Sequence, residues 1–449
     1  MREGSLEAPT RHALDWQNPW FWDEKALEKE MERVFDICHG CRRCFNLCDS
    51  FPRLFDLIDS GPTGELDGVK KQDYGRVEAA CTLCDMCFMT KCPYVPPHEW
   101  AVDFPHLMLR HRAVQAHKKG IDFVEGQLAE TDRMGRLGSF AAGLANWVTD
   151  EANTPTRRSM ERLAGIHHGA RLPRFAGETF EMRAAREALP INEAAPAFGK
   201  RKAVLYATCF VNFNNTDIGA AARAVLARNG VETEVVYPAC CGMPKLELGD
   251  LAAVAEAARQ VTAALLPWVD RGYDIIALTP SCALMLKFEW PLILSKDPLV
   301  ERLAQATFDI SEYVVDIAKK DGLAPGLEPI EGGVSLHLAC HARAQNMGAK
   351  AAEMLRLVPK TRVAVIERCS GHGGIWGTRT ENFATAVKVG TPAAQAALKA
   401  DTRFVASECP LAAEHLTQVM EMTAADHKPE PFRASHPIEL LARAYGLTG

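Results

Sequence analysis

Apolar and polar positions divide the chain into a helical first part and a later part in which short apolar runs alternate with helical stretches. Ahead of the first cysteine, Leu27, Met31, Val34 and Phe35 recur at helical spacing. This pattern predicts a helix that leads the chain to Cys38. The loop-forming residues 60–64 then separate two cysteine-bearing segments.

A second apolar pattern lies within residues 98–197, which contain no cysteine and are mainly helical in pattern. The stripe comprises Leu137, Phe140, Leu144, Trp147 and Val148. Because most stripes of this kind face a core, we expect it to be buried. Contact with a membrane or with a partner is the alternative.

From about residue 200 onward, short runs typical of buried strands alternate with helical stretches. Strands are predicted at 203–208, 234–237 and 274–278, and again at 334–338, 362–366 and 402–406. Helices are predicted at about 217–229 and 250–270. The pattern repeats after roughly 130 residues. Each copy therefore reads β-α-β-α-β, the order of an α/β module with a parallel sheet.

The N-terminal part carries two regularly spaced runs of cysteines. They are Cys38, Cys41, Cys44 and Cys48, followed by Cys81, Cys84, Cys87 and Cys92. The first run reads C-x2-C-x2-C-x3-C, whereas the second has four residues in its last gap and is followed by a proline. This spacing is typical of two-cluster bacterial ferredoxins, in which the last cysteine of a run ligates the other cluster.

Two [4Fe–4S] clusters are therefore expected, each held by three cysteines of one run and the last cysteine of the other. The first N-terminal site is Cys38, Cys41, Cys44 and Cys92. The second N-terminal site is Cys81, Cys84, Cys87 and Cys48. Zinc is the alternative, since C-x2-C pairs also suit tetrahedral zinc. Two triplets with a trailing fourth cysteine are nevertheless a poor zinc pattern.

The remaining cysteines follow the predicted strands of the two modules. The module 1 site consists of Cys209, Cys240, Cys241 and Cys282, and the module 2 site of Cys340, Cys369 and Cys409. Because the carboxyl ends of parallel strands share one edge of a sheet, the cysteines of each module should converge there. Four thiolates can complete a four-iron cluster or hold another metal, whereas three leave one iron without a ligand.

Composition narrows the function classes. The chain has 449 residues, 47% of them hydrophobic, and a net charge of −6, which does not favour nucleic-acid binding. Its 15 cysteines, in a chain of this length with no signal peptide visible, favour metal ligation over disulfides. No apolar run reaches the length of a membrane span. We therefore expect a cytoplasmic protein, at most peripheral to a membrane.

Several histidines and tryptophans have both a functional and a structural interpretation. His341, next to Cys340, would be a fourth ligand of the module 2 site, but bonding to a nearby carbonyl is the expected role. His372 lies on a glycine-rich turn that suits a cofactor or simply a tight turn. We expect His39, His167 and His168 to be solvated or structural. The group Trp16, Trp20 and Trp22 would bind a partner or cover the first N-terminal site.

The paired modules resemble the cysteine-rich CCG domains in the B and D subunits of heterodisulfide reductase. They also resemble the iron–sulfur subunits of glycolate oxidase and of anaerobic glycerol-3-phosphate dehydrogenase, in which it is the C subunit. The resemblance implies a helical dicluster ferredoxin domain (1–110), a helical connector (111–199) and two CCG modules (200–325 and 326–449). In the family each module has five cysteines, but here the remaining positions carry Met285, Ser370 and Ala412.

These departures favour electron transfer over disulfide chemistry. No G-x-G-x-x-G opens a helix after a strand, so neither flavin nor nicotinamide is expected in this chain. The resemblance therefore implies a subunit that passes electrons from a flavoprotein dehydrogenase, or a small redox protein, to a quinone, redox-protein or thiol acceptor. The module 1 site would be its terminal site. The alternatives are an enzyme that reduces a disulfide at the module 1 site, and an interaction scaffold that carries clusters.

Overall fold

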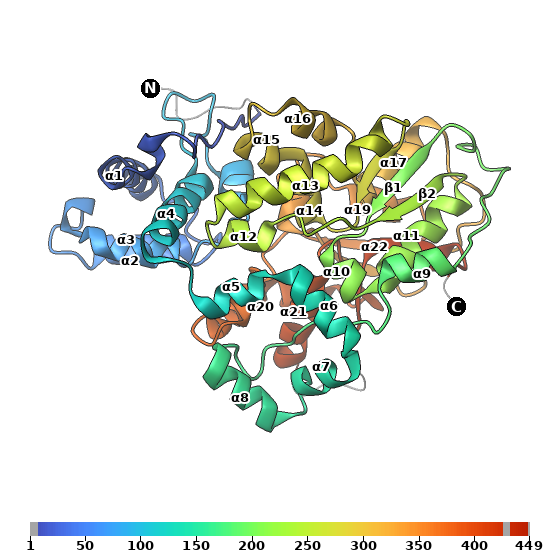
Figure 1. Ribbon diagram of the computed structural model, residues 1–449. Coiled ribbons are helices and arrows are strands. Elements are labelled where there is room, and N and C mark those ends of the chain that lie inside the picture. The colour runs from blue at the N-terminus through green and yellow to red at the C-terminus, as the bar shows by residue number, and fades with distance from the viewer. Residues whose placement is uncertain (1–7, 425–431, 448–449) are drawn as a thin grey trace.

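The computed structural model describes residues 8–424 and 432–447 and begins with a helical region (Figure 1). Its helices are α1 (Glu24–Cys41), α2 (Ser50–Asp59), α3 (Tyr74–Glu78) and α4 (Phe104–Lys119), with short turns η1 (Pro19–Trp22), η2 (Leu66–Gly68), η3 (Lys71–Asp73) and η4 (Cys87–Lys91). The Asp23 carboxylate accepts hydrogen bonds from the first amides of α1 and caps it. The predicted stripe of α1 is buried, which confirms that prediction.

A buried cluster of charges fixes the N-terminal segment and the second cysteine loop to the rest of the protein. Arg11 forms ion pairs with Asp85 (2.8 Å), Asp103 (2.8 Å) and Glu289 (3.2 Å). Trp16 Nε1 donates to the Ile293 carbonyl at 2.9 Å. Two distant parts of the chain, one near residue 85 and one near residue 290, are therefore held against the same N-terminal segment.

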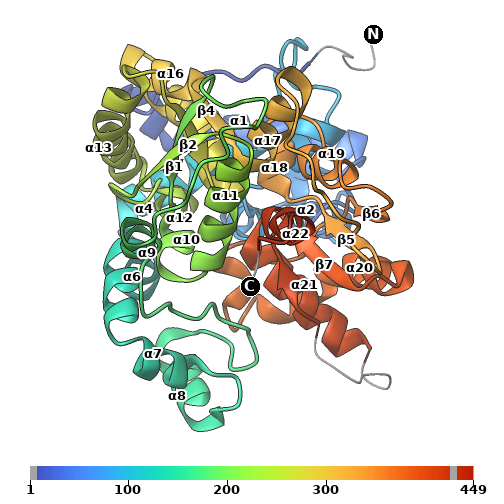
Figure 2. The same ribbon diagram turned by 90° about the vertical axis from the view of Figure 1, so that its right-hand side faces the viewer.

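Five helices connect this region to the sheets: α5 (Phe123–Ala129), α6 (Thr131–Phe140), α7 (Ala142–Thr149), α8 (Thr154–Ala164) and α9 (Phe180–Arg186). In both views α7 and α8 lie at the lower end of the molecule, away from α1 (Figures 1 and 2). Within the described ranges, no helix combines the length and apolar character that crossing a membrane requires.

The expectation that the apolar stripe of α6 and α7 is buried is wrong. Leu137, Phe140, Leu144 and Trp147 are 60%, 92%, 64% and 59% exposed. The buried face of α6 is made of small residues instead, because Gly135 and Gly138 lie directly on the rings of Phe213 and Phe175 with no room for a Cβ. The large side chains therefore point outward.

Module 1 is built on a parallel sheet with the order β2-β1-β3-β4. Its strands are β1 (Lys202–Tyr206), β2 (Glu232–Val236), β3 (Asp274–Ala277) and β4 (Thr307–Asp309). Its helices are α10 (Cys209–Phe213), α11 (Thr216–Arg228), α12 (Met243–Glu247), α13 (Leu251–Val269), α14 (Pro280–Leu284), α15 (Trp290–Ile293), α16 (Pro298–Gln305) and α17 (Ile310–Lys320), with the π turn η5 (Met285–Glu289). The first three strands match the prediction; β4 is a short edge strand that was not predicted.

Module 2 repeats this arrangement with the order β6-β5-β7-β8, again parallel. Its strands are β5 (Val334–His337), β6 (Val363–Ile366), β7 (Phe404–Ser407) and β8 (Ala434–Ser435). Its helices are α18 (Cys340–Ala344), α19 (Lys350–Arg356), α20 (Phe383–Ala400), α21 (Pro410–Thr423) and α22 (Pro437–Ala444), with the turn η6 (Trp376–Thr378). The predicted fold class, a helical region followed by two parallel-sheet modules, is confirmed.

Each module contributes one helix that packs on a helix of the other module. Helix α17, which follows the sheet of module 1, packs on α19 of module 2, and α22, at the end of module 2, packs on α11 of module 1 (Figure 2). A hydrogen bond supports the second contact, since Tyr445 Oη, at the end of α22, donates to Asn229 Oδ1 at the end of α11 at 3.4 Å. These contacts hold the two sheets in a fixed relation to each other.

Two buried histidines make module 2 sensitive to acid. His337 Nε2 donates to the Arg368 carbonyl, and His436 Nδ1 accepts from the Ile438 amide at the start of α22. Burial lowers the pKa of His337 to about 4 and that of His436 to about 3. An unfolded histidine has a pKa of about 6.5, so below that pH the unfolded state binds more protons and stability falls.

We therefore predict that the free energy of unfolding decreases between pH 7 and pH 5 by about 2 kcal/mol for each of these histidines. Urea unfolding at both pH values measures it. His436→Asn keeps a helix-capping side chain but does not titrate, so it should make the decrease about 2 kcal/mol smaller. The exposed His168→Gln is the control. An unchanged pH dependence in His436→Asn would contradict the prediction.

Candidate metal centres

The first N-terminal site gathers at the end of α1. Cys38 and Cys41 belong to its last turns, and Arg42, in the left-handed region at φ 51°, turns the chain back toward Cys44. Cys92 follows η4, and all four cysteines of the site line one cavity of about 310 Å³, counted with its opening to solvent. The structure thus brings the last cysteine of the second run to the first three of the first run.

Burial raises the pKa of Cys38, Cys44 and Cys92, and neighbouring cysteines raise it further. The pKa of Cys38 lies well above its ordinary value because of burial and then of Cys92, whereas that of Cys44 rises to about 12. Lys91 and Arg43 act in the opposite direction on Cys44 and Cys92. Thiols that oppose one another's ionisation need positive charge among them to act as thiolates, and iron or another metal supplies it.

The second N-terminal site gathers in the loop that follows α3. Burial, then Cys84 and Cys81, raise the pKa of Cys48, so Cys48 has crossed to the second run. Leu83 and Asp85 have positive φ angles of 49° and 63°, which wind the loop tightly between its cysteines. Cys44 is among the groups that raise the pKa of Cys87, so the two N-terminal sites adjoin.

Arg112 of α4 holds this loop against module 1. Its guanidinium donates to the Cys81 carbonyl (2.8 Å), to the Glu78 carboxylate (2.6 Å) and to the Glu247 carbonyl at the end of α12 (2.6 Å). Arg112 therefore holds the second cysteine loop at a fixed distance from α12 of module 1. Sequence reasoning missed Arg112, because one arginine in a helical stretch gives no signal.

The module 1 site lies where the strands of its sheet end. Cys209 begins α10, Cys240 and Cys241 follow β2, and Cys282 lies in α14. The sulfur atoms form two pairs, Cys209–Cys240 at 3.9 Å and Cys241–Cys282 at 3.2 Å. Sharing a proton with Cys209 lowers the pKa of Cys240 and raises that of Cys209.

Two residues of the connector complete the surroundings of the module 1 site. The Asp132 carboxylate accepts from the Cys240 amide at 3.1 Å and from the Tyr237 hydroxyl. The buried Thr131 hydroxyl forms no hydrogen bond within the described residues, but it lies near the thiols of Cys209 and Cys240 and acts to lower their pKa. The first turn of α6 therefore touches this site directly. Nothing in the sequence pattern of the connector indicated these two residues.

The module 2 site faces the second N-terminal site. Cys340 begins α18, Cys369 follows β6, and Cys409 caps α21. After burial, Cys84 is the strongest influence that raises the pKa of Cys340, and Cys369 is the strongest that raises that of Cys84. The sequence did not predict this proximity, because it joins segments far apart in the chain.

The glycine-rich turn after Cys369 permits this close approach. At Gly373, which has a φ of 58°, a Cβ would lie 2.7 Å from the Thr82 methyl group. Trp376 Nε1 donates to the Ala79 carbonyl at 2.8 Å. His341 Nε2 donates to the Leu83 carbonyl at 3.4 Å, the carbonyl-bonding role expected of it. The turn and the histidine therefore both bind module 2 to the second cysteine loop.

The spacing of the thiols bears on the choice between zinc and a larger group. In the described residues, no cysteine belongs to a group of three metal-binding side chains whose ligand atoms all lie within 4.8 Å of one another. Zinc–sulfur bonds of about 2.3 Å place the ligands of one zinc ion closer together than that. The cysteines therefore surround more space than a single zinc ion fills, which suits iron–sulfur clusters.

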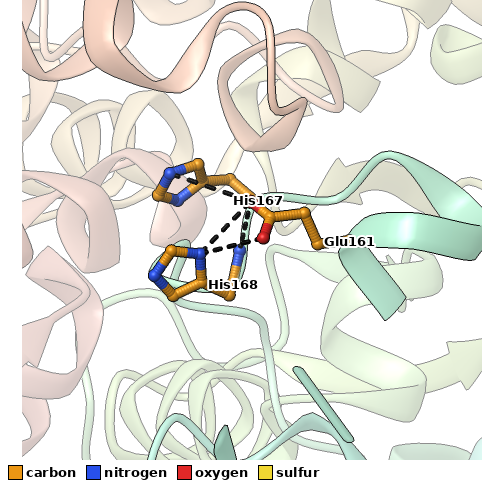
Figure 3. Close-up of side chains that lie close together, drawn as sticks. All are labelled: Glu161, His167 and His168. Carbon is orange, nitrogen blue, oxygen red and sulfur yellow. Dashed lines mark hydrogen bonds and ion pairs between the residues drawn. The ribbon is translucent and has the colours of Figure 1, made fainter. Parts of the chain in front are cut away.

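The one group that meets this criterion in the described residues is Glu161, His167 and His168 (Figure 3). The Gly169 amide donates to His167 Nδ1 at 3.1 Å, so the proton of this ring lies on Nε2, the nitrogen that faces Glu161. A metal would need the lone pair of that nitrogen. The group therefore fits an ion pair and not a metal site, in line with the structural role expected for these histidines.

Thiol sites in a helical region and at the strand ends of two interlocked parallel-sheet modules define an iron–sulfur protein with cysteine-rich domains. Comparison with known proteins agrees. The model of the cysteine-rich domain family CCG matches residues 203–287, that is, module 1 up to η5. The match does not extend to module 2, which has fewer cysteines.

Named relatives cover more of the chain. The C subunit of anaerobic glycerol-3-phosphate dehydrogenase from Escherichia coli K12 is 26% identical over 71% of this chain and 76% of its own length. Lactate utilization protein A of Geobacillus kaustophilus is 30% identical over 40% of this chain and 75% of its own length. The chain therefore belongs to the family of iron–sulfur subunits that carry CCG cysteine-rich domains, and its general role is that of an electron-transfer subunit.

Proposed function

We propose that this chain carries electrons from a flavin-dependent dehydrogenase to an acceptor, along a row of four thiol sites. The first and second N-terminal sites would each hold a [4Fe–4S] cluster, and the module 1 site a third metal centre at the end of the row. A thiolate-bound cluster accepts and releases single electrons at a potential that hydrogen bonds and burial adjust. The chain's own residues supply the ligands, the burial and the spacing.

The continuity of the row is the observation that carries this proposal. Cys44 of the first N-terminal site adjoins Cys87 of the second, and Cys84 of the second adjoins Cys369 of module 2. The short helix α12 continues the row, because it starts just after Cys241 and ends at Glu247, whose carboxylate influences Cys409. Four separate structural sites would not need to adjoin in this order.

Two acidic side chains beside the row have raised pKa values. Burial raises the pKa of Glu247 to about 7 and that of Glu408, next to Cys409, to about 8. Both carboxyl groups can therefore be protonated near neutral pH, which removes negative charge that would oppose the arrival of electrons. The buried arginine Arg112 adds a positive charge between the second loop and module 1.

Reduction of a disulfide at the module 1 site receives less support. At module 1 the family's fifth cysteine position is occupied by the buried Met285, so the site has four thiolates and not five. The scaffold alternative also receives less support, since the sulfur atoms of the module 1 site still form close pairs. The name of one relative, the C subunit of anaerobic glycerol-3-phosphate dehydrogenase, favours a dehydrogenase as the partner.

Electron delivery by the isolated chain tests the proposal. Protein purified without oxygen, reduced by a chemical donor and freed from it, should reduce a quinone analogue or another one- or two-electron acceptor. A protein that contains reduced clusters but passes no electrons to any acceptor would contradict the proposed function.

A further inference from the structure

Helices α6 and α7 present an apolar surface that the protein itself leaves uncovered. It is formed by Leu137, Phe140, Leu144 and Trp147, each more than half exposed. Both helices pack on the same strap of chain, because Gly138 lies on the Phe175 ring and Asn146 hydrogen-bonds the Phe175 backbone at both its amide and its carbonyl. Their opposite faces therefore both point outward.

Two exposed arginines lie beside this surface. Arg133 and Arg136, on the exposed side of α6, form no salt bridge with any residue in the described ranges, although Arg133 donates to the Gln127 side chain and Arg136 acts to lower the pKa of Glu181. The acidic residues that follow α7 are already neutralised, since Glu151 pairs with Arg171 at 2.7 Å and Asp150 with Arg174 at 3.6 Å. In a chain with a net charge of −6, the surface is a local exception.

We propose that the α6–α7 surface binds the interface of a membrane that contains anionic phospholipids. Aromatic and aliphatic side chains beside unpaired arginines are typical of helices that lie in the headgroup region. Each basic residue near an anionic surface strengthens binding about fivefold. This kind of binding needs no membrane-spanning helix, because the side chains enter only the outer part of the bilayer.

The α6–α7 surface lies one helix away from the module 1 site. The first turn of α6 touches the module 1 site through Thr131 and Asp132, and its last turn carries Phe140. One helix of about 15 Å therefore joins the site to the surface. Resting on the proposed function, we infer that membrane binding brings the module 1 site near an acceptor dissolved in the lipid.

Flotation of the holoprotein with vesicles tests the inference. We expect it to float with vesicles of phosphatidylcholine and phosphatidylglycerol, and at least tenfold less with phosphatidylcholine alone. Phe140→Ser/Trp147→Ser should reduce binding at least tenfold, and Arg133→Gln/Arg136→Gln should reduce it only on the anionic vesicles. The control is Phe123→Ser, which removes a ring that is 76% exposed on α5, outside the surface.

The possible results separate this inference from the proposed function. A wild-type protein that floats with neither vesicle, or a Phe140→Ser/Trp147→Ser variant that floats as well as wild type, would overturn the inference. Dimerisation through this surface without lipid would also overturn it. Electron delivery to a water-soluble acceptor should be the same in this variant as in wild type. Loss of that delivery in wild-type protein would count against the proposed function instead.

Discussion

Cys241→Ala should abolish electron delivery to an acceptor and leave the two N-terminal sites intact. Cys241 is buried at the module 1 site, 3.2 Å from Cys282, and its removal leaves three thiolates where a four-iron cluster needs four ligands. The N-terminal sites lie in a separate helical region and share no ligand with it. We expect acceptor reduction to fall at least a hundredfold, a loss of about 3 kcal/mol in transition-state stabilisation.

The measurement compares acceptor reduction with the metal content and low-temperature electron paramagnetic resonance of the same sample. Met285→Leu is a matched control, because Met285 is buried in the same module and a volume-conserving change costs little. It should keep full iron and full activity. Full iron together with full activity in Cys241→Ala would instead favour the scaffold alternative.

Cys48→Ala should remove the cluster of the second N-terminal site and spare the first. Although Cys48 belongs to the first run, the structure places its thiol beside Cys81 and Cys84. A protein with two four-iron clusters should lose about four of about eight irons. Metal analysis and the spectrum of the remaining cluster measure the loss.

Cys92→Ala provides the reciprocal test, because Cys92 lies beside Cys38 and Cys44. It should remove the first cluster and leave the second. If each variant lost the cluster of its own run, the two runs would not exchange ligands and the assignment of both N-terminal sites would fail.

The spacing of apolar residues predicted the elements whose structure depends on residues close in sequence. The buried stripe of α1 and the first three strands of each module follow directly from apolar spacing. The edge strands β4 and β8 did not, since runs of three and two residues are too short to give a pattern. The contacts of α17 and α22 with the other module depend on tertiary packing and leave no local signal either.

The stripe of α6 and α7 shows where such reasoning fails for a physical reason. Apolar spacing indicates one face of a helix but not whether the protein covers it. Here the glycines Gly135 and Gly138 make the buried face, because they let aromatic rings approach the backbone. Glycines at helical spacing opposite a large apolar stripe were the signal that could have suggested an exposed surface.

The candidate sites were predictable as groups but not in their mutual arrangement. Regular spacing led to the ligand sets of the N-terminal sites, and strand ends led to the thiols of the modules. The proximity of Cys84 to Cys369 joins segments far apart in the chain. Asp132, which contacts the Cys240 amide, lies in a connector without cysteines. Both depend on how the regions pack.

Iron and acid-labile sulfide analysis of wild-type protein purified without oxygen, combined with electron paramagnetic resonance after reduction, tests most directly whether the thiol sites hold iron–sulfur clusters. We predict about eight irons with an equal amount of sulfide, or about twelve if the module 1 site also holds a four-iron cluster. Because Cys44 adjoins Cys87, the two N-terminal signals should show magnetic interaction. Stoichiometric zinc without acid-labile sulfide would contradict the assignment of both N-terminal sites.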